Sequence, residues 1–189
     1  MDKQQFLQRF SYHHLNDIES GYHHAGNLKH ASVLIPLVHT KQGIEVILTK
    51  RSKHLKHHPG QISFPGGKVE AADIDLTDTA LREAEEEIGL NRGDVDIVGQ
   101  LNDYHTITGF QITPVIGFIP QDYPFNIDEN EVEEVFSVPF LHFINEKNHL
   151  NYQLKRQGVE HNIYFMPYLK YNIWGATAAI LKDLVSHLK

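Results

Sequence analysis

The sequence contains no cysteine and no long apolar run. The absence of cysteine excludes disulfides, thiolate nucleophiles and cysteine-ligated zinc sites. No stretch approaches the roughly 20 apolar residues that a membrane-spanning helix needs. The opening residues, MDKQQFLQRFSYHH, also lack the continuous apolar run of a signal peptide. We therefore expect a soluble, cytoplasmic protein with no membrane partner.

Positive charge is also scarce, since the chain has a formal net charge of −7 with histidine neutral. Such a chain gains no bulk attraction to nucleic acid or to anionic lipid. If the substrate is a polyanion, local basic side chains or metal ions must supply the attraction. The composition therefore argues against nucleic acid as a partner.

The chain does have enough hydrophobic sequence for a single domain spanning residues 1–189. Its 189 residues are 41% hydrophobic, and neither a repeat nor a linker divides them. Helical spacing and apolar runs predict helices near 6–10, 77–88 and 173–188, and strands at 31–39, 44–51, 95–101, 110–119, 150–156 and 161–167. This mixture predicts an α/β (α+β) fold with a central mixed β-sheet between helical layers.

An acidic face on the predicted helix 77–88 is the first functional signal. At ~100° per residue, Glu83, Glu86 and Glu87 fall on one arc. Carboxylates spaced this way are only ~5–6 Å apart at Cβ and repel one another. A hard divalent cation relieves the repulsion by taking carboxylate oxygens, and it makes bound water easier to ionise. The alternative is a solvated, glutamate-rich helix face.

The segment 66–90 as a whole resembles the Nudix box, Gly-x5-Glu-x7-Arg-Glu-apolar-x-Glu-Glu-x-Gly-apolar. The second half of that box is matched in full, by Arg82, Glu83, Ala84, Glu86, Glu87, Gly89 and Leu90. The first half departs from it, because the acidic position after Gly67 holds Asp73 and one extra residue precedes Arg82. Asp73 and Glu70 therefore compete for the first acidic position.

The resemblance implies a Nudix-type α/β/α sandwich and a hydrolase of phosphoanhydride bonds that uses Mg²⁺ or Mn²⁺. Glu86 and Glu87 would be metal ligands. Glu83 would be a further ligand or the general base that deprotonates the attacking water. Arg82 would hold Glu83 in place by a forked hydrogen bond.

Two other groups of residues remain open. Nudix enzymes often recruit a further carboxylate from a downstream loop, for which Glu131 and Glu134 are the candidates; the alternative for both is a solvated edge. The histidines His54, His57 and His58 have no tetrahedral partners in view, so we expect them to be solvated rather than to bind metal. His58 is close to a histidine position of the subgroup described next, and is a candidate substrate contact.

The segment before the box, ILTKRSKHLKHHPGQISFPGG (47–67), resembles the signature of the coenzyme A pyrophosphatase subgroup of the Nudix family. The positions that match in register are Leu48, Thr49, Arg51, Ser52, Gly60, Phe64, Pro65, Gly66 and Gly67. Lys56 stands where the subgroup has arginine, which keeps the charge but loses the bidentate fork. The segment IWGATAAIL (173–181) is also similar to this subgroup.

This likeness implies hydrolysis of the diphosphate of coenzyme A, or of its derivatives, to 3′,5′-ADP and 4′-phosphopantetheine. The substrate-binding residues would be Arg51, Lys56, Gly60, Phe64, Gly66 and Gly67. Lys50 and its basic neighbours would meet the phosphate charge. The alternative for Arg51 is a surface salt bridge, and for Phe64 it is packing beneath the loop.

Two rival functions stay open. The first is a Nudix hydrolase of another nucleotide derivative, such as ADP-ribose, a dinucleotide or an oxidised nucleoside triphosphate. The second is a non-catalytic Nudix-like binding module, which the retention of Glu83, Glu86 and Glu87 disfavours. In each case the partner is a small nucleotide-derived molecule, and the chain is expected to be a monomer or a homodimer.

Overall fold

A mixed β-sheet lies at the centre of the computed structural model, which describes residues 1–12, 28–156 and 159–189. Within these residues the sheet has eight strands, in the order β3-β2-β1-β7-β5, with β8 beside β2, β4 beside β1 and β6 beside β7. The strands are β1 (Lys29–Thr40), β2 (Gly43–Arg51), β3 (Ile62–Ser63), β4 (Gly66–Lys68), β5 (Asp96–Gln100), β6 (Tyr104–His105), β7 (Phe110–Ile119) and β8 (Val132–Pro139). Strands β1 and β7 run parallel, and the other pairs are antiparallel.

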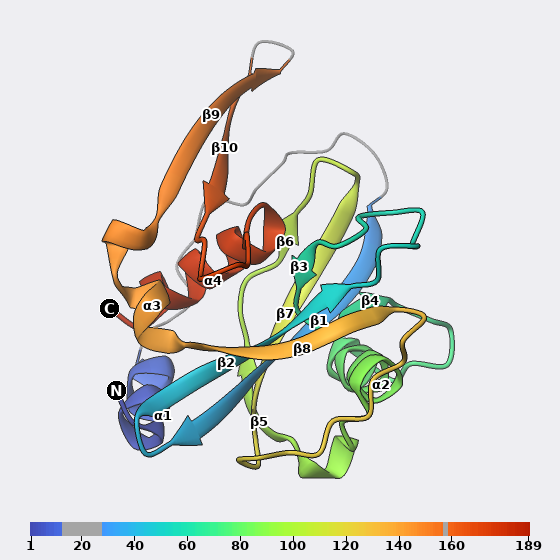
Figure 1. The fold of residues 1–189 in the computed structure, drawn as a ribbon, viewed down its shortest axis with the longest axis vertical. Coiled ribbons are helices and arrows are strands. Elements are labelled where there is room, and N and C mark those ends of the chain that lie inside the picture. The colour runs from blue at the N-terminus through green and yellow to red at the C-terminus, as the bar shows by residue number, and fades with distance from the viewer. Residues whose placement is uncertain (13–27, 157–158) are drawn as a thin grey trace.

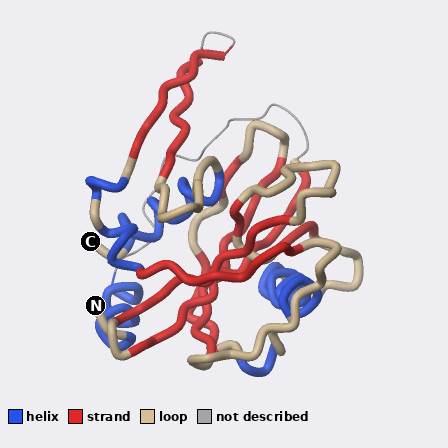
Figure 2. Tube along the Cα trace, viewed as in Figure 1, coloured by secondary structure: helices blue, strands red, loops and turns tan. Residues whose placement is uncertain are grey.

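Helices cover both faces of this sheet (Figures 1 and 2). They are α1 (Lys3–Tyr12), α2 (Leu76–Ile88), α3 (Phe140–Ile144) and α4 (Ala176–His187), with 3₁₀ turns at Arg92–Asp94 and Glu146–Asn148. Because successive strand residues point to opposite faces, Leu34 packs in the core beneath α2, whereas Ile35 packs in the core beneath α1, α3 and α4. The predicted α/β/α sandwich with a mixed sheet is confirmed.

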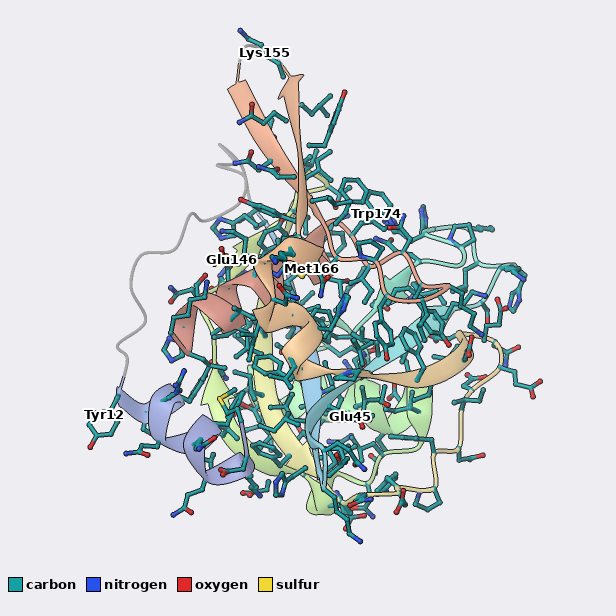
Figure 3. All side chains as sticks on the ribbon, turned by 60° about the vertical axis from the view of Figure 1, so that its left-hand side comes forward. Tyr12, Glu45, Glu146, Lys155, Met166 and Trp174 are labelled. Atoms are coloured by element: carbon teal, nitrogen blue, oxygen red, sulfur yellow. The ribbon has the colours of Figure 1, made fainter. Side chains whose placement is uncertain are left out.

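A two-stranded ribbon projects from the body of the molecule (Figure 1). It consists of β9 (Leu150–Arg156) and β10 (Val159–Phe165), which pair in antiparallel register. Lys155 lies near its far end, and Met166 and Trp174 lie near its base (Figure 3). Both strands were predicted, with bounds that differ by no more than two residues at any end.

The predicted helix 173–188 starts later than expected, at Ala176. The three residues before it pair with the end of β10 instead. The Met166 N–H donates to the Ile173 carbonyl at 2.8 Å, and the Gly175 N–H donates to the Tyr164 carbonyl at 3.0 Å. Long-range pairing therefore overrides the helical spacing of these residues. Among the described residues, no helix is both long and apolar enough to cross a membrane.

Candidate active site

Helix α2 begins and ends on local signals that fix the direction of its carboxylates. The Asp75 side chain caps the first turn by accepting the Asp78 N–H at 2.8 Å. Gly89 ends the helix in the left-handed conformation at φ 66°. A Cβ at position 89 would lie 2.8 Å from the Asn126 carbonyl oxygen, so glycine is required for space as well as for conformation.

The glycine pair before α2 brings the helix against the sheet. Gly66 has φ 154°, and a Cβ there would lie 2.5 Å from the Ser32 carbonyl oxygen and 2.6 Å from the Val33 Cα. A Cβ at Gly67 would lie 2.5 Å from Cδ of Glu83. The Glu83 carboxylate therefore occupies the space that a side chain at position 67 would fill. This explains why the FPGG turn and the acidic helix occur together.

Arg82 is the centre of a hydrogen-bond network around the acidic face. Its Nε and Nη2 donate to the two oxygens of Asp73 at 2.8 and 3.1 Å. Its Nη1 donates to Glu83 at 3.0 Å and to Glu86 at 3.1 Å. Arg82 holds Glu83, as expected, but its forked pair is with Asp73. Of the two candidates for the first acidic position, Asp73 is therefore the one whose carboxylate pairs with Arg82.

The extra residue in the box is accommodated at the protein surface. Asp73 also accepts the Thr79 hydroxyl at 2.8 Å and the Glu70 N–H at 2.8 Å, which closes the loop around its carboxylate. The next side chain, Ile74, is 89% exposed. The lengthened loop therefore bulges outward and leaves the spacing of the helical carboxylates unchanged.

Glu87 is a buried carboxylate with a weak cationic partner. It is only 3% exposed, and its Oε1 lies 3.9 Å from Nη1 of Arg51. Burial, together with the charges of Glu131 and Glu83, raises the pKa of Glu87 to about 8, although Arg51 opposes the shift. A buried carboxylate in this setting is stabilised by a cation.

The other two carboxylates of the arc are less buried than Glu87. Burial raises the pKa of Glu83, and its hydrogen bond from Arg82 opposes this shift. The Glu86 side chain is 60% exposed and contacts Arg82. Glu85 points elsewhere and pairs with Arg92 at 2.8 Å. The acidic arc expected from the sequence is therefore present, with Glu85 outside it.

The structure separates the two candidates for a further carboxylate. Glu131 is close enough to Glu83 and Glu87 to raise the pKa of both. Glu134 instead accepts the Tyr171 hydroxyl at 2.6 Å and the Lys170 ammonium at 3.1 Å, and these contacts lower its pKa. Glu131 thus belongs to the acidic cluster, whereas Glu134 is bonded to Lys170 and Tyr171.

The segment that carries Glu131 is attached at two points. The Asp128 N–H donates to the Glu87 carbonyl at 3.0 Å, which joins the segment to the end of α2. Ser52 donates its N–H to the Glu131 carbonyl at 2.9 Å and its hydroxyl to the Glu129 carbonyl at 2.8 Å. Ser52 matches the subgroup signature, but this anchoring contact could not be predicted from the sequence.

The donor set suits a hard divalent cation, because Glu83, Glu86, Glu87 and Glu131 offer only carboxylate oxygens. The structural observation that supports this fit is the burial of the Glu87 carboxylate, which a bound cation would stabilise in its charged form. Among the described residues, no three acidic or histidine side chains already stand in a metal-binding arrangement. Glu86 is the most exposed helical member of this set, and its carboxylate accepts a hydrogen bond from Arg82 at 3.1 Å.

The predicted substrate-binding residues fall into different surroundings. Arg51 follows a register shift between Lys50 and Arg51 in the β2–β8 pair, and such bulges redirect side chains. Lys56 is exposed. Phe64 is buried in the core beneath α4, so its side chain packs there. Gly60 lines a cavity of ≈ 360 Å³ together with Lys50, His58, Gln61 and residues of the 170–174 segment.

Sequence reasoning missed the 170–174 wall of this cavity. Lys170, Tyr171, Asn172 and Trp174 all line it. The only sequence feature that pointed to this segment was the likeness of residues 173–181 to the coenzyme A pyrophosphatase subgroup. That likeness did not assign a role to any residue.

Comparison with known proteins agrees with this geometry. Residues 28–158 match the family described as NUDIX domain. The chain is 40% identical over 158 residues to "Uncharacterized Nudix hydrolase NudL" of Enterobacter sp. (strain 638), covering 84% of this chain and 82% of the relative. The protein of the same name from Yersinia enterocolitica is 38% identical over 184 residues, covering 97% and 92%.

Solved structures share the fold. A NUDIX hydrolase from Alicyclobacillus acidocaldarius superposes with a TM-score of 0.52 at 16% identity, covering 86% of this chain and 93% of that one. The C. elegans Ap4A hydrolase in a binary complex gives a TM-score of 0.51 at 16% identity, covering 59% and 80%. The chain belongs to the Nudix family and is a Nudix hydrolase. Members of this family use divalent metal ions and act on small nucleotide-derived substrates.

Proposed function

We propose that this Nudix hydrolase cleaves the diphosphate of coenzyme A or its derivatives, with Mg²⁺ or Mn²⁺, to give 3′,5′-ADP and 4′-phosphopantetheine. The observation that carries this proposal is the approach of Arg51 to Glu87, at 3.9 Å. Arg51 comes from the segment that resembles the coenzyme A pyrophosphatase signature, and Glu87 comes from the acidic helix. A cation and a guanidinium would then meet the same diphosphate.

Each residue has a role that follows from its position. Glu86, Glu87 and Glu131 would hold the cation, and Glu83 would be a further ligand or the general base. When bound, the cation would neutralise diphosphate charge and lower the pKa of water. Arg51 is placed to donate to a phosphate oxygen by a forked hydrogen bond. Glu83 is the candidate general base, because burial raises its pKa and Arg82 fixes its orientation.

The remaining charge of coenzyme A, its separate 3′-phosphate, requires further positive groups. Lys50 and Lys56 are near Arg51 in sequence, and Lys56 is exposed to solvent. Lys56 offers a point charge rather than the planar fork of arginine. Under this proposal the substrate is still coenzyme A, and its phosphate is bound more weakly by Lys56 than it would be by arginine.

Product analysis tests the proposal. Purified protein is incubated with coenzyme A and Mg²⁺ or Mn²⁺, and in parallel with ADP-ribose. We expect 3′,5′-ADP and 4′-phosphopantetheine as products, with a higher kcat/KM for coenzyme A. Much faster turnover of ADP-ribose would overturn the substrate assignment, and no turnover of any diphosphate would favour the binding module.

A matched pair of variants tests the metal role. Glu87→Gln should lower kcat/KM by about 100-fold or more, because it removes a buried ligand charge. Glu85→Gln is the control, since Glu85 is on the same helix but pairs with Arg92 outside the acidic arc. Equal activity in both variants would contradict the role of Glu87.

A further inference from the structure

The ≈ 360 Å³ cavity is separate from the acidic cluster. Among the described residues, its walls are Lys50, the 58–62 segment and the 170–174 segment, and no carboxylate of α2 reaches it. Its volume falls within the ~300–1,000 Å³ range of small-molecule sites. The proposed cleavage reaction does not by itself account for this space.

The two walls are joined to each other and to the acidic cluster. The Thr177 hydroxyl donates to the Ile62 carbonyl at 3.1 Å, which ties the start of α4 to the 58–62 wall. That wall is hydrogen-bonded to Arg51, whose N–H donates to the Gln61 carbonyl at 2.9 Å. Arg51 in turn faces Glu87. A ligand in the cavity is therefore next to the residue that would grip the diphosphate.

The backbone in and beside the walls takes conformations that side chains rarely adopt. His58, which lines the cavity, has φ 55°, and Leu169, directly before the 170–174 wall, has φ 50°. Positive φ is uncommon for residues other than glycine, and for a bulky residue it is an outlier. Such strain gathers at ligand sites, where the surrounding structure holds it in place. Glycines with positive φ, Gly60 and Gly175, adjoin the same walls.

Trp174 gives the cavity an aromatic platform. Its ring stacks on Phe165 with centroids 6.0 Å apart and an interplanar angle of 12°, yet the residue is 38% exposed. Tyr171 is fixed beside it, because its ring stacks on Phe136 at 3.6 Å and its hydroxyl donates to Glu134. One face of Trp174 is thus supported, and part of the ring remains accessible.

Polar groups in the walls match a nucleotide. Gln61 and Asn172 bring amides, which donate and accept as the edge of a base requires. Lys50 is held by Glu133 at 2.8 Å and Lys170 by Glu134 at 3.1 Å. Each ammonium has three donors, so both can also donate to a phosphate oxygen.

We propose that this cavity binds the purine base of the nucleotide half of the substrate, stacked on Trp174, with Gln61 and Asn172 at the base edge. The inference rests on the proposed function and assigns one half of that substrate to one place. Aromatic stacking accepts any base face, and the amides supply the selection. The pantetheine half would then lie outside the cavity.

Trp174 also provides the assay, because it is the only tryptophan in the chain. The complete protein is titrated with 3′,5′-ADP or with 4′-phosphopantetheine while tryptophan fluorescence and binding heat are followed. We expect saturable quenching with 3′,5′-ADP and none with 4′-phosphopantetheine. Quenching by 4′-phosphopantetheine alone would overturn the proposal, because the cavity would then hold the other half.

Variants of Trp174 separate binding from structure. Trp174→Ala should weaken the binding of 3′,5′-ADP by about tenfold, and should raise the KM of the substrate more than it lowers kcat. Trp174→Phe should recover most of the affinity. Tyr152→Ala is the control, since Tyr152 is 62% exposed on the β9–β10 ribbon and does not line the cavity. Unchanged affinity in Trp174→Ala would overturn the proposal.

The two proposals fail separately. If ADP-ribose proves to be the substrate and Trp174→Ala raises its KM, the coenzyme A assignment falls and the base site is supported. If coenzyme A is hydrolysed and Trp174→Ala leaves its KM unchanged, the proposed function is supported and the proposed base-binding site is contradicted.

Discussion

Arg82 and Asp73 form a two-bond fork, with Nε to Oδ1 at 2.8 Å and Nη2 to Oδ2 at 3.1 Å. The Asp73 side chain is 2% exposed and that of Arg82 is 11% exposed. The fork leaves Nη1 for Glu83 and Glu86, so one guanidinium joins the loop before α2 to its acidic face. Loss of either partner should loosen that face.

Asp73→Asn should reduce the free energy of unfolding by about 1–3 kcal/mol, because it weakens a charge-assisted pair that is largely out of water. The hydrogen bonds from Arg82 hold the pKa of Asp73 far below its ordinary range. A carboxyl group with a lowered folded-state pKa stabilises the fold above its unfolded pKa of about 3.9. That contribution is lost as the pH falls toward the lowered value.

Denaturant unfolding between pH 3 and pH 7, without divalent cations, measures this effect. The stability gap between the wild type and Asp73→Asn should be full near neutral pH and should narrow below about pH 4. Asp75→Asn is the control, since asparagine caps a helix as well as aspartate does. A gap that stays constant over the whole pH range would contradict the assignment.

Gly67→Ala tests the space that the Glu83 carboxylate occupies. The added Cβ would lie 2.5 Å from Cδ of Glu83, so Glu83 must move away from its place over the turn. We expect kcat to fall by about 100-fold with only a modest loss of stability, since the glutamate side chain is displaced while the helix remains. Steady-state kinetics and thermal unfolding of the variant give both quantities.

Gly93→Ala provides a comparison for Gly67→Ala, because a Cβ there would meet only the Asn91 side-chain oxygen, at 3.2 Å. This variant should keep its activity. If Gly67→Ala were equally active, Glu83 would not need the position that the structure gives it.

Glu131 and Glu134 should respond differently to neutralisation. Glu131→Gln removes a carboxylate that acts on Glu83 and Glu87, and should raise the metal concentration needed for half-maximal activity by about tenfold. Glu134→Gln should leave that metal concentration unchanged, because Glu134 is bonded to Tyr171 and Lys170. Mn²⁺ titrations of both variants decide between them, and the reverse order of effects would contradict the assignment.

Signals that are local in sequence predicted the fold best. The α2 bounds, predicted at 77–88 and observed at Leu76–Ile88, follow from helix-forming residues and the stop at Gly89. Strand β7 was predicted at its observed bounds, because its sequence FQITPVIGFI is rich in apolar and β-branched residues. The carboxylate arc of α2 was also predictable, since helical geometry alone places those side chains.

Features that depend on distant residues could not be predicted in this way. The parallel pairing of β1 with β7 joins segments that are far apart in sequence. Strand β8 was not predicted, because its segment is acidic before it becomes apolar, and its pairing with the distant strand β2 fixes it. Which of Glu131 and Glu134 faces the acidic cluster depends on contacts with Ser52 and Tyr171. The residues next to each glutamate in the sequence do not reveal those contacts.

The outward bulge at Ile74 makes this chain well suited to site-specific labelling. Ile74 is 89% exposed and lies in the loop closed by Asp73, directly before the acidic helix. Since the chain has no cysteine, Ile74→Cys would introduce a single thiol without removing a core side chain. One fluorophore or spin label attached there would lie on the loop that the Asp73–Arg82 pair joins to the acidic face, and would report changes in that loop when a cation binds to an otherwise native protein.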